Sequence, residues 1–424
     1  MIDVVWFRDL WVIFRRICLL LILLTLFGGS SLTFHEPADR VHHLSSPYEF
    51  DFLGWTVAAA MDKSIHVALG TSHFLEEDER VALVREYLGL VGEIQSTRTD
   101  LEAAYGDPDP ARSAAEVGRI GAGLLQLTGE AESLRSIAEA ILQEQVAFIL
   151  AELEFGLSGF IFPPVAFRFA QLPSSLITSP RDVIRQDVSI SLRVDMPLDE
   201  KVALEQQVER MEGVSALVVP VGGLGTYPTM ILESTALSWI AEVTAHEWVH
   251  NYLSFRPLGW NYGVNPDLRT MNETTASLIG LAVGREVLAR YYPDLLPPSS
   301  TPAQAVEPFE PRSFDFQAEM RITRLHVDEL LEQGELDSAE SYMEQRRLFF
   351  WENGYRIRKI NQAYFAFYGA YADQPGGASG DDPVGESVRM LWQRSSGPAA
   401  FLRTMAWMNS YDDLLAELHL PLRD

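Results

Sequence analysis

Two histidines four residues apart, His246 and His250, stand in the segment EVTAHEWVHNYL (residues 242–253). On an α-helix, side chains at this spacing lie one above the other on the same face. Glu247 follows the first histidine and would point about 100° further round the helix. This H-E-x-x-H spacing brings two zinc ligands and a general base together. The segment therefore predicts a helix that holds a zinc ion, and two buried core histidines are the alternative.

A catalytic zinc ion also needs a third protein ligand and an open fourth position. A histidine six residues after the second one would complete another zinc-peptidase pattern, but Arg256 occupies that position, and the next histidine is His326. Glu273 begins a predicted helix after a turn-rich loop, so a helix–loop–helix return could bring its carboxylate to the histidines. Two alternatives remain open. Thr270 to Glu273 also fits a capping box, and Asp267 is a competing carboxylate.

The spacing of these motifs resembles that of a known family. HEWVH followed 23 residues later by the glutamate of NETTA is similar to the pattern of the gluzincin zinc peptidases. More narrowly, it resembles bacterial membrane-associated aminopeptidases of that type, whose later Asn-rich helical segment is similar to RKINQAYFAFYGAY at 358–371. The resemblance covers about residues 240–290 and, more weakly, 356–372.

The resemblance implies roles for several residues. The zinc ligands would be His246, His250 and Glu273, and the catalytic base would be Glu247. Ser277 is a departure, because thermolysin-like members keep an aspartate there that orients the first histidine. If Ser277 cannot orient that histidine, another acceptor is needed, with Asn272 or Glu242 as candidates. Three tyrosines in the later segment could stabilise the oxyanion, with packing as core aromatics as the alternative for each of them: Tyr364, Tyr368 and Tyr371.

The N-terminus carries an uninterrupted apolar run, ICLLLILLTLF at 17–27, preceded by arginines that include Arg15 and Arg16. This pattern predicts a signal anchor or a signal peptide, with a buried N-terminal helix as the alternative. The arginines should stay cytoplasmic, which places residues 35–424 on the extracytoplasmic side of the membrane. We expect an anchored protein, or a secreted one if the segment is cleaved. Cys18 is the single cysteine, so no intrachain disulfide can form.

The pattern along the chain predicts an α+β fold that is mostly helical. Apolar residues recur at helical spacing over 74–155, and YGDPDP at 105–110 divides this region into a helical hairpin. Strands are expected at 160–169, 188–194, 214–222 and 223–232, and further helices at 198–212, 233–255, 270–292, 314–334 and 336–372. The predicted regions are a membrane segment (1–34), a helical N-terminal region (35–155), a zincin-like catalytic core with a small sheet (156–292) and a helical C-terminal region (293–424).

The net charge of −26 excludes a nucleic-acid partner, which requires clustered lysine and arginine. No motif supports a nucleotide partner either. The sequence therefore predicts Zn²⁺-dependent hydrolysis of peptide bonds in a peptide or protein substrate, with an aminopeptidase as one form of it. In this prediction VPVGGLGTYPTM at 219–230 supplies an edge strand for the substrate. The alternatives are a zinc hydrolase of a non-peptide amide and a non-catalytic, membrane-anchored protein that binds a partner through 74–155.

Overall fold

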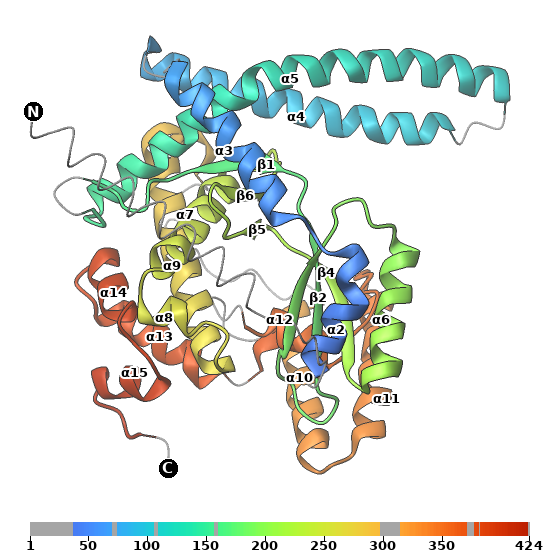
Figure 1. Cartoon of the computed structure of the whole chain (residues 1–424), viewed down its shortest axis with the longest axis vertical. Coiled ribbons are helices and arrows are strands. Elements are labelled where there is room, and N and C mark those ends of the chain that lie inside the picture. Colours follow the sequence, from blue (N-terminus) through green and yellow to red (C-terminus); the bar gives the residue numbers. More distant parts are fainter. Residues whose placement is uncertain are drawn as a thin grey trace, which may run out of the picture.

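Helices make up most of the structure, and two small three-stranded sheets lie between them (Figure 1). This computed structural model describes residues 37–69, 74–105, 109–156, 160–296, 314–370, 377–380 and 382–422. The expected α+β, mostly helical class is confirmed. The longer helices are α2 (Pro37–Ser45), α3 (Phe52–Leu69), α4 (Glu77–Tyr105), α5 (Pro110–Glu152), α6 (Leu198–Glu212), α7 (Leu237–Leu253), α9 (Pro266–Tyr291), α10 (Phe316–Glu332), α11 (Leu336–Glu352), α13 (Pro383–Arg394) and α14 (Pro398–Met405).

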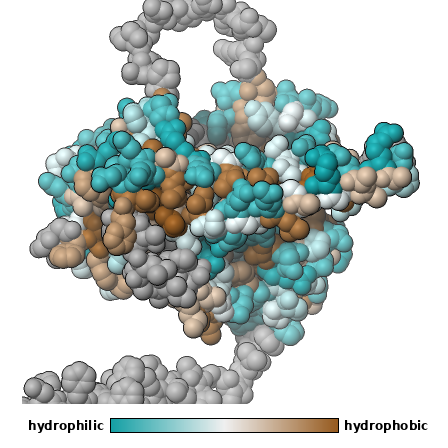
Figure 2. Space-filling view, turned by 90° about the horizontal axis from the view of Figure 1, so that it is seen from above, coloured by the Kyte–Doolittle hydropathy of each residue, from teal (hydrophilic) through white to brown (hydrophobic). Residues whose placement is uncertain are grey.

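The expected helical hairpin is present as α4 and α5, which form an arm that projects from the molecule (Figure 1). The second helix starts where Asp109 caps the backbone N–H of Ala111 at 3.0 Å and Pro110 occupies the first helical position. Only the base of the arm is packed in the main core, for example through Tyr87 and Ile141. On the face seen from above, hydrophobic residues gather beside this base (Figure 2).

The predicted membrane segment at 1–34, with Cys18, lies outside the described residues. Among the helices that the structure does describe, none is both long and apolar enough to cross a membrane. The membrane segment therefore stays a prediction.

The first sheet runs in the order β1 (Phe167–Ala170), β6 (Thr229–Leu232) and β5 (Gly223–Leu224). β1 and β6 are parallel, and β5 is an antiparallel edge strand. The predicted strand at 160–169 is therefore shorter and shifted. The single strand predicted over 223–232 is instead two short strands, β5 and β6, with a turn between them.

The second sheet is antiparallel, with the order β3 (Val188–Leu192), β2 (Ser174–Ser179) and β4 (Ser215–Pro220). Its apolar face packs against α2 and α6. The sequence patterns missed β2, because four of the six residues in SSLITS are polar. Ser175, Thr178 and Ser179 are nevertheless buried, because β2 is the central strand of its sheet.

The outer edge of β4 is closed by side chains instead of a further strand. Glu205 of α6 accepts a hydrogen bond from the backbone N–H of Val218 at 2.6 Å, and Glu209 accepts one from Ala216 at 3.2 Å. These two carboxylates therefore take the place that carbonyl groups of a neighbouring strand would have. Such capping keeps an edge strand from pairing with another chain.

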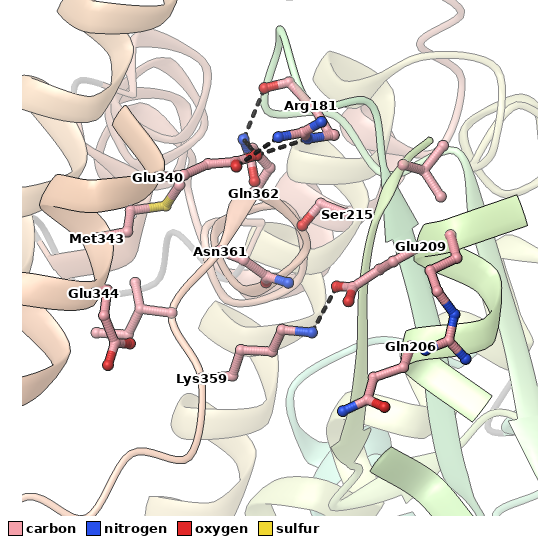
Figure 3. Close-up of a pocket in the computed structure, with 13 residues that line it drawn as sticks. Arg181, Gln206, Glu209, Ser215, Glu340, Met343, Glu344, Lys359, Asn361 and Gln362 are labelled. Carbon is pink, nitrogen blue, oxygen red and sulfur yellow. Dashed lines mark hydrogen bonds and ion pairs between the residues drawn. The ribbon is translucent and has the colours of Figure 1, made fainter. Parts of the chain in front are cut away.

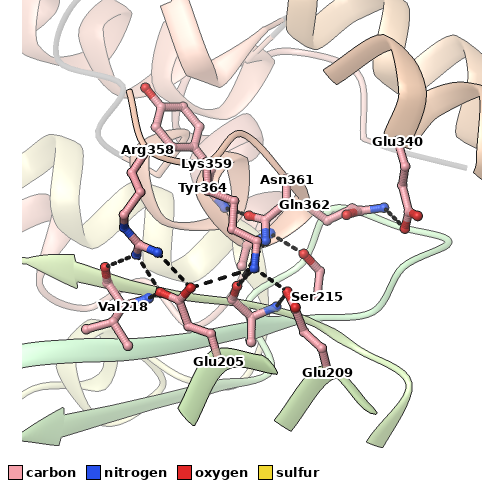
Figure 4. Close-up of polar contacts among 12 residues, drawn as sticks. Glu205, Glu209, Ser215, Val218, Glu340, Arg358, Lys359, Asn361, Gln362 and Tyr364 are labelled. Carbon is pink, nitrogen blue, oxygen red and sulfur yellow. Dashed lines mark hydrogen bonds and ion pairs between the residues drawn. The ribbon is translucent and has the colours of Figure 1, made fainter. Parts of the chain in front are cut away.

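The segment before α12 (Gln362–Tyr368) supplies the matching donors (Figure 4). Arg358 donates to Glu205 at 2.5 and 2.8 Å and to the carbonyl of Val218 at 3.3 Å. Lys359 donates to Glu209 at 2.5 Å and to the carbonyl of Ala216 at 3.1 Å. The network ties the C-terminal helices to the sheet, and so it determines where α12 lies.

A pocket of about 450 Å³ lies beside this network, between α6 and α11 (Figure 3). Arg181 and Glu340 pair across it through Nη2 and Oε2 at 2.6 Å. Four of its charged side chains, Arg181, Glu209, Glu340 and Lys359, are thus paired with one another. The Arg181–Glu340 pair joins the loop between β2 and β3 to α11. The Lys359–Glu209 pair joins the segment before α12 to α6.

We expect Arg358→Ala to reduce stability markedly, because it leaves the carboxylate of Glu205, which is 2% exposed, without its main partner. Breaking a fully buried ion pair costs about 3–5 kcal/mol. The Arg358 side chain is 33% exposed, so water partly replaces it, and we expect a loss of about 2–3 kcal/mol in the free energy of unfolding. Urea denaturation measures this loss. The control Arg119→Ala, from an exposed pair with Glu116, should leave the free energy of unfolding nearly unchanged; equal losses would contradict the prediction.

The predicted helix at 336–372 is wrong as one continuous element. α11 ends at Glu352, Gly354 takes a left-handed conformation with φ of 91°, and α12 starts only at Gln362. A left-handed residue ends a helix, and glycine adopts it without steric cost. The chain ends in α13, α14 and α15 (Tyr411–Glu417), which share one hydrophobic core with α7, α9 and the base of the arm.

Candidate metal centre

The histidine pair lies on α7, as its spacing predicts. Apolar residues such as Ala241, Ala245 and Trp248 form one buried face of this helix. His246 and His250 lie together on another face, with their Nε2 atoms 3.0 Å apart and their ring centroids 4.8 Å apart. Their side chains are only 14% and 19% exposed. Both imidazoles can therefore reach a single ion.

The return of the chain from α7 to α9 is tight. It passes through the short helix α8 (Pro257–Trp260), where a Cβ on Gly259 would overlap the carbonyl of Leu253. Asn265 then caps α9 by accepting from the N–H of Leu268 at 2.9 Å. Because the helix starts here, Glu273 lies inside it, about two turns from the cap. The capping-box alternative for Glu273 is therefore wrong.

Two glycines let α9 approach α7 closely. A Cβ on Gly280 would stand 2.9 Å from the carbonyl oxygen of Glu242 and 3.2 Å from Cβ of His246. A Cβ on Gly284 would stand 3.0 Å from the backbone nitrogen of Glu242. Both distances are shorter than ordinary packing allows. The spacing of these two helices, and with it the distance from Glu273 to the histidines, depends on the two glycines.

The structure brings three of the predicted ligands together, since the ligand atoms of His246, His250 and Glu273 all lie within 4.8 Å of one another. Oε2 of Glu273 is 3.5 Å from Nε2 of His246 and 3.6 Å from Nε2 of His250. Four ligands at about 2.0–2.1 Å around a tetrahedral ion would be about 3.3–3.4 Å apart. The competing carboxylate, Asp267, is not part of this cluster.

Oε2 of Glu273 also indicates a missing partner. This oxygen is buried and has no hydrogen-bond donor among the described residues. A buried carboxylate oxygen without a partner is costly. A cation held between it and the two imidazoles would remove that cost, so the residues present fit a metal ion with two nitrogen ligands and one oxygen ligand.

Polar side chains orient both imidazoles. Asn272 Oδ1 lies 2.8 Å from Nδ1 of His250, and its amide nitrogen donates to the carbonyl of Leu258. The amide is thus turned so that its oxygen accepts from Nδ1–H, and the lone pair of the neutral imidazole is then on Nε2 of His250. Ser277 Oγ lies 3.4 Å from Nδ1 of His246. Ser277 therefore lies where an acceptor for His246 is expected, and Asn272 orients His250.

Sequence reasoning missed Tyr262 and Arg269. The Tyr262 hydroxyl donates to Oε1 of Glu273 at 2.5 Å, and Arg269 Nε donates to that hydroxyl at 3.3 Å. Arg269 also donates to the carbonyl of Ala366 in α12 at 2.9 Å. Burial and the Glu273 carboxylate raise the pKa of Tyr262 above its usual range, so the hydroxyl stays a donor. No local motif marks Tyr262, because it lies in the loop between α8 and α9.

The tyrosines expected to stabilise an oxyanion are placed elsewhere. Tyr364 and Tyr368 pack together, with ring centroids 4.6 Å apart, beside the apolar cluster of Ile177 and Leu217 on the second sheet. Neither lines the cleft that contains the candidate ligands, whereas Phe367 does. Tyr371 lies outside the described residues.

The three ligands and Glu247 line one cleft of about 410 Å³ between the α7–α9 pair and the second sheet. Glu247 is 6% exposed and accepts no hydrogen bond from any described residue. It lies against the backbone of β5, where a Cβ on Gly223 would overlap its carboxylate and one on Gly225 would stand 3.5 Å away. Burial raises the pKa of Glu247, although the nearby histidines lower it in part.

The charges of His250 and Glu273 depend on each other. Burial lowers the pKa of His250, but the Glu273 carboxylate outweighs burial and raises this pKa to about 9. Burial in turn raises the pKa of Glu273, but His250 brings it well below the usual range. Glu273 is therefore ionised at neutral pH, as a metal ligand must be, and a metal ion would compete with the proton on His250.

Comparison of the chain with protein-family models, with curated proteins and with solved structures gives no match. Function is therefore inferred from the geometry of this cleft.

We expect Gly280→Ala to weaken metal binding by about 10-fold to 100-fold, the range typical when the support of a ligand is disturbed. The added methyl group must push α9 away from α7, which displaces Glu273 from His246. Competition with a chelating dye measures the affinity. The control Gly129→Ala on α5 has open space around the new methyl group, so it should keep the affinity and stabilise the helix by about 0.5–1 kcal/mol. Equal affinities in both variants would contradict the prediction.

Proposed function

We propose that this protein is a zinc-dependent peptidase of the gluzincin type. One observation carries the proposal: a buried carboxylate without a hydrogen-bond partner, Glu247, lies in the same cleft as the cluster of His246, His250 and Glu273. Two imidazoles and one carboxylate leave a zinc ion the open position that catalysis requires. Burial raises the pKa of Glu247, which lies in the same cleft, and a base with a raised pKa suits acid–base catalysis near neutral pH.

In this proposal His246, His250 and Glu273 hold the metal ion. Zinc would supply Lewis acidity, which activates water and polarises the scissile carbonyl. Glu247 takes a proton from the attacking water on its carboxylate and then delivers it to the nitrogen of the leaving amine. Tyr262 and Arg269 keep the Glu273 carboxylate in place through its other oxygen.

The edge strand β5 supports a peptide as the substrate. It pairs with β6 on one side, and Gly223, Leu224 and Gly225 line the cleft beside Glu247. An extended peptide can add to such an edge through main-chain hydrogen bonds. The glycines keep the strand free of side chains that would hold the substrate away from Glu247. A peptide is therefore favoured over a non-peptide amide.

The test combines metal analysis with peptide hydrolysis by the purified full-length chain. We expect about one zinc ion per chain, loss of hydrolysis after chelation and its return after zinc is added back. Mass spectrometry of the products shows whether residues are removed from the N-terminus or bonds are cut inside the peptide. A chain that holds zinc but cuts no peptide would favour the non-catalytic, membrane-anchored alternative. If the chain takes up no metal, His246 and His250 are core histidines and not metal ligands.

The site of action at the extracytoplasmic face of the membrane is part of the same proposal. It rests on the apolar run at 17–27 and the arginines before it. Fractionation of cells, with protease added from outside, tests this placement.

A further inference from the structure

The cleft has a second wall, which the second sheet provides. β3 alternates strictly: Val188, Ile190 and Leu192 point into the core, and Ser189 and Ser191 point the other way. Both serines line the cleft, together with Ser175 of the neighbouring strand. Side chains on a strand alternate between its faces, so the serines form one continuous surface of hydroxyl groups.

This wall still has hydrogen-bonding capacity. Ser175 and Ser189 share one hydrogen bond of 2.9 Å between their hydroxyl oxygens, which leaves one of the two protons for another acceptor. The Ser191 hydroxyl has no hydrogen-bond partner in the part of the chain that the structure describes. Gln186 lies beside them, and its buried Oε1 has no donor among the described residues.

The wall also carries no charge. Its lining residues from the β2–β3 hairpin are three serines and one glutamine: Ser175, Gln186, Ser189 and Ser191. A charged group placed here would gain no counter-ion from the wall. An apolar group would cover the hydroxyls and leave them unpaired. An uncharged, hydrogen-bonding group avoids both problems, because it needs no counter-ion and can donate to Gln186 Oε1 and accept from Ser191.

We propose that Ser189, Ser191 and Gln186 form a subsite that recognises an uncharged, hydrogen-bonding side chain of the substrate, such as that of serine, threonine, asparagine or glutamine. This proposal rests on the proposed peptidase function and adds the substrate class. A site built to bond polar groups discriminates against analogues that lack them more strongly than an apolar pocket discriminates by size.

Two measurements on the zinc-loaded, full-length chain test the subsite. The first is mass spectrometry of a mixed peptide library after digestion, which gives the residues next to each cleaved bond. The second is the affinity of hydroxamate-capped dipeptides with glutamine, leucine or lysine side chains, which needs a bound metal but no turnover. Both compare the wild type with the double variant Ser189→Ala/Ser191→Ala. Ser133→Ala on α5 is the control, because this exposed serine bonds only to its own helix.

We expect the wild type and Ser133→Ala to prefer glutamine-type side chains, and the double variant to lose about fivefold to tenfold of that preference, as for one lost hydrogen bond. An unchanged cleavage profile and unchanged hydroxamate affinities in the double variant would overturn the subsite and leave the peptidase function intact. If the wild type binds no hydroxamate and cuts no peptide, the peptidase function itself is refuted, and the subsite with it.

Discussion

Glu247→Gln should lower kcat for peptide hydrolysis by about 10²-fold to 10⁴-fold, the contribution typical of a positioned general base. Glutamine has nearly the same size and shape as glutamate but cannot accept a proton. The variant should keep its metal, because Glu247 points beside the ligand cluster and is not part of it. The expected result is therefore a folded, zinc-loaded chain with almost no activity.

Zinc content, measured by mass spectrometry of the intact protein or by atomic absorption, and kcat measured on the same sample test this prediction. Glu286→Gln is a suitable control, since Glu286 is exposed on α9 and should change neither quantity. Activity within a few-fold of the wild type in Glu247→Gln would remove Glu247 from the mechanism. Loss of zinc together with activity would mean that the carboxylate holds the metal ion.

Glu273→Ala should have the second large effect, on metal affinity. Loss of a residue that only supports a ligand typically costs 10-fold to 100-fold in affinity. Removal of a ligand itself should therefore cost more than about 100-fold. Two imidazoles remain in place, so weak binding should persist. The variant also deletes a buried oxygen that lacks a donor, and so the metal-free chain should stay folded.

Metal titration followed by thermal unfolding tests this expectation. Added zinc should raise the Tm of the wild type, because a ligand that binds only the native state stabilises it. The same zinc concentration should raise the Tm of Glu273→Ala far less. Glu286→Ala, on the same helix, should behave like the wild type. An equal rise in Tm for Glu273→Ala would show that another group completes the site.

Several features of the site could be derived from the sequence because they depend on neighbouring residues. The helical spacing of His246 and His250 places both on one face of α7, whatever surrounds that helix. The same reasoning found the hairpin, whose break at 105–110 is marked by proline and glycine. It went wrong at 336–372, where Gly354 takes a left-handed conformation that the pattern did not reveal.

The third ligand shows the limit of such reasoning. Both Glu273 and Asp267 suited the role on sequence grounds, and only the close packing of α9 on α7 placed Glu273 beside the histidines. Tyr262, which orients Glu273, has no local signature at all. The buried strand β2 was hidden for a related reason, since only the tertiary fold makes it the central strand of the second sheet.

The sequence by itself determined the secondary structure of α7, the placement of His246 and His250 on one face of it with Glu247 beside them, and the helical class of the fold. These properties follow from the period of an α-helix and from local turn chemistry. The tertiary structure alone decided which carboxylate joins the histidines, which groups orient the imidazoles and which hydroxyls face them across the cleft. Those relations join residues from different helices and strands, and their distances are set by how closely the elements pack.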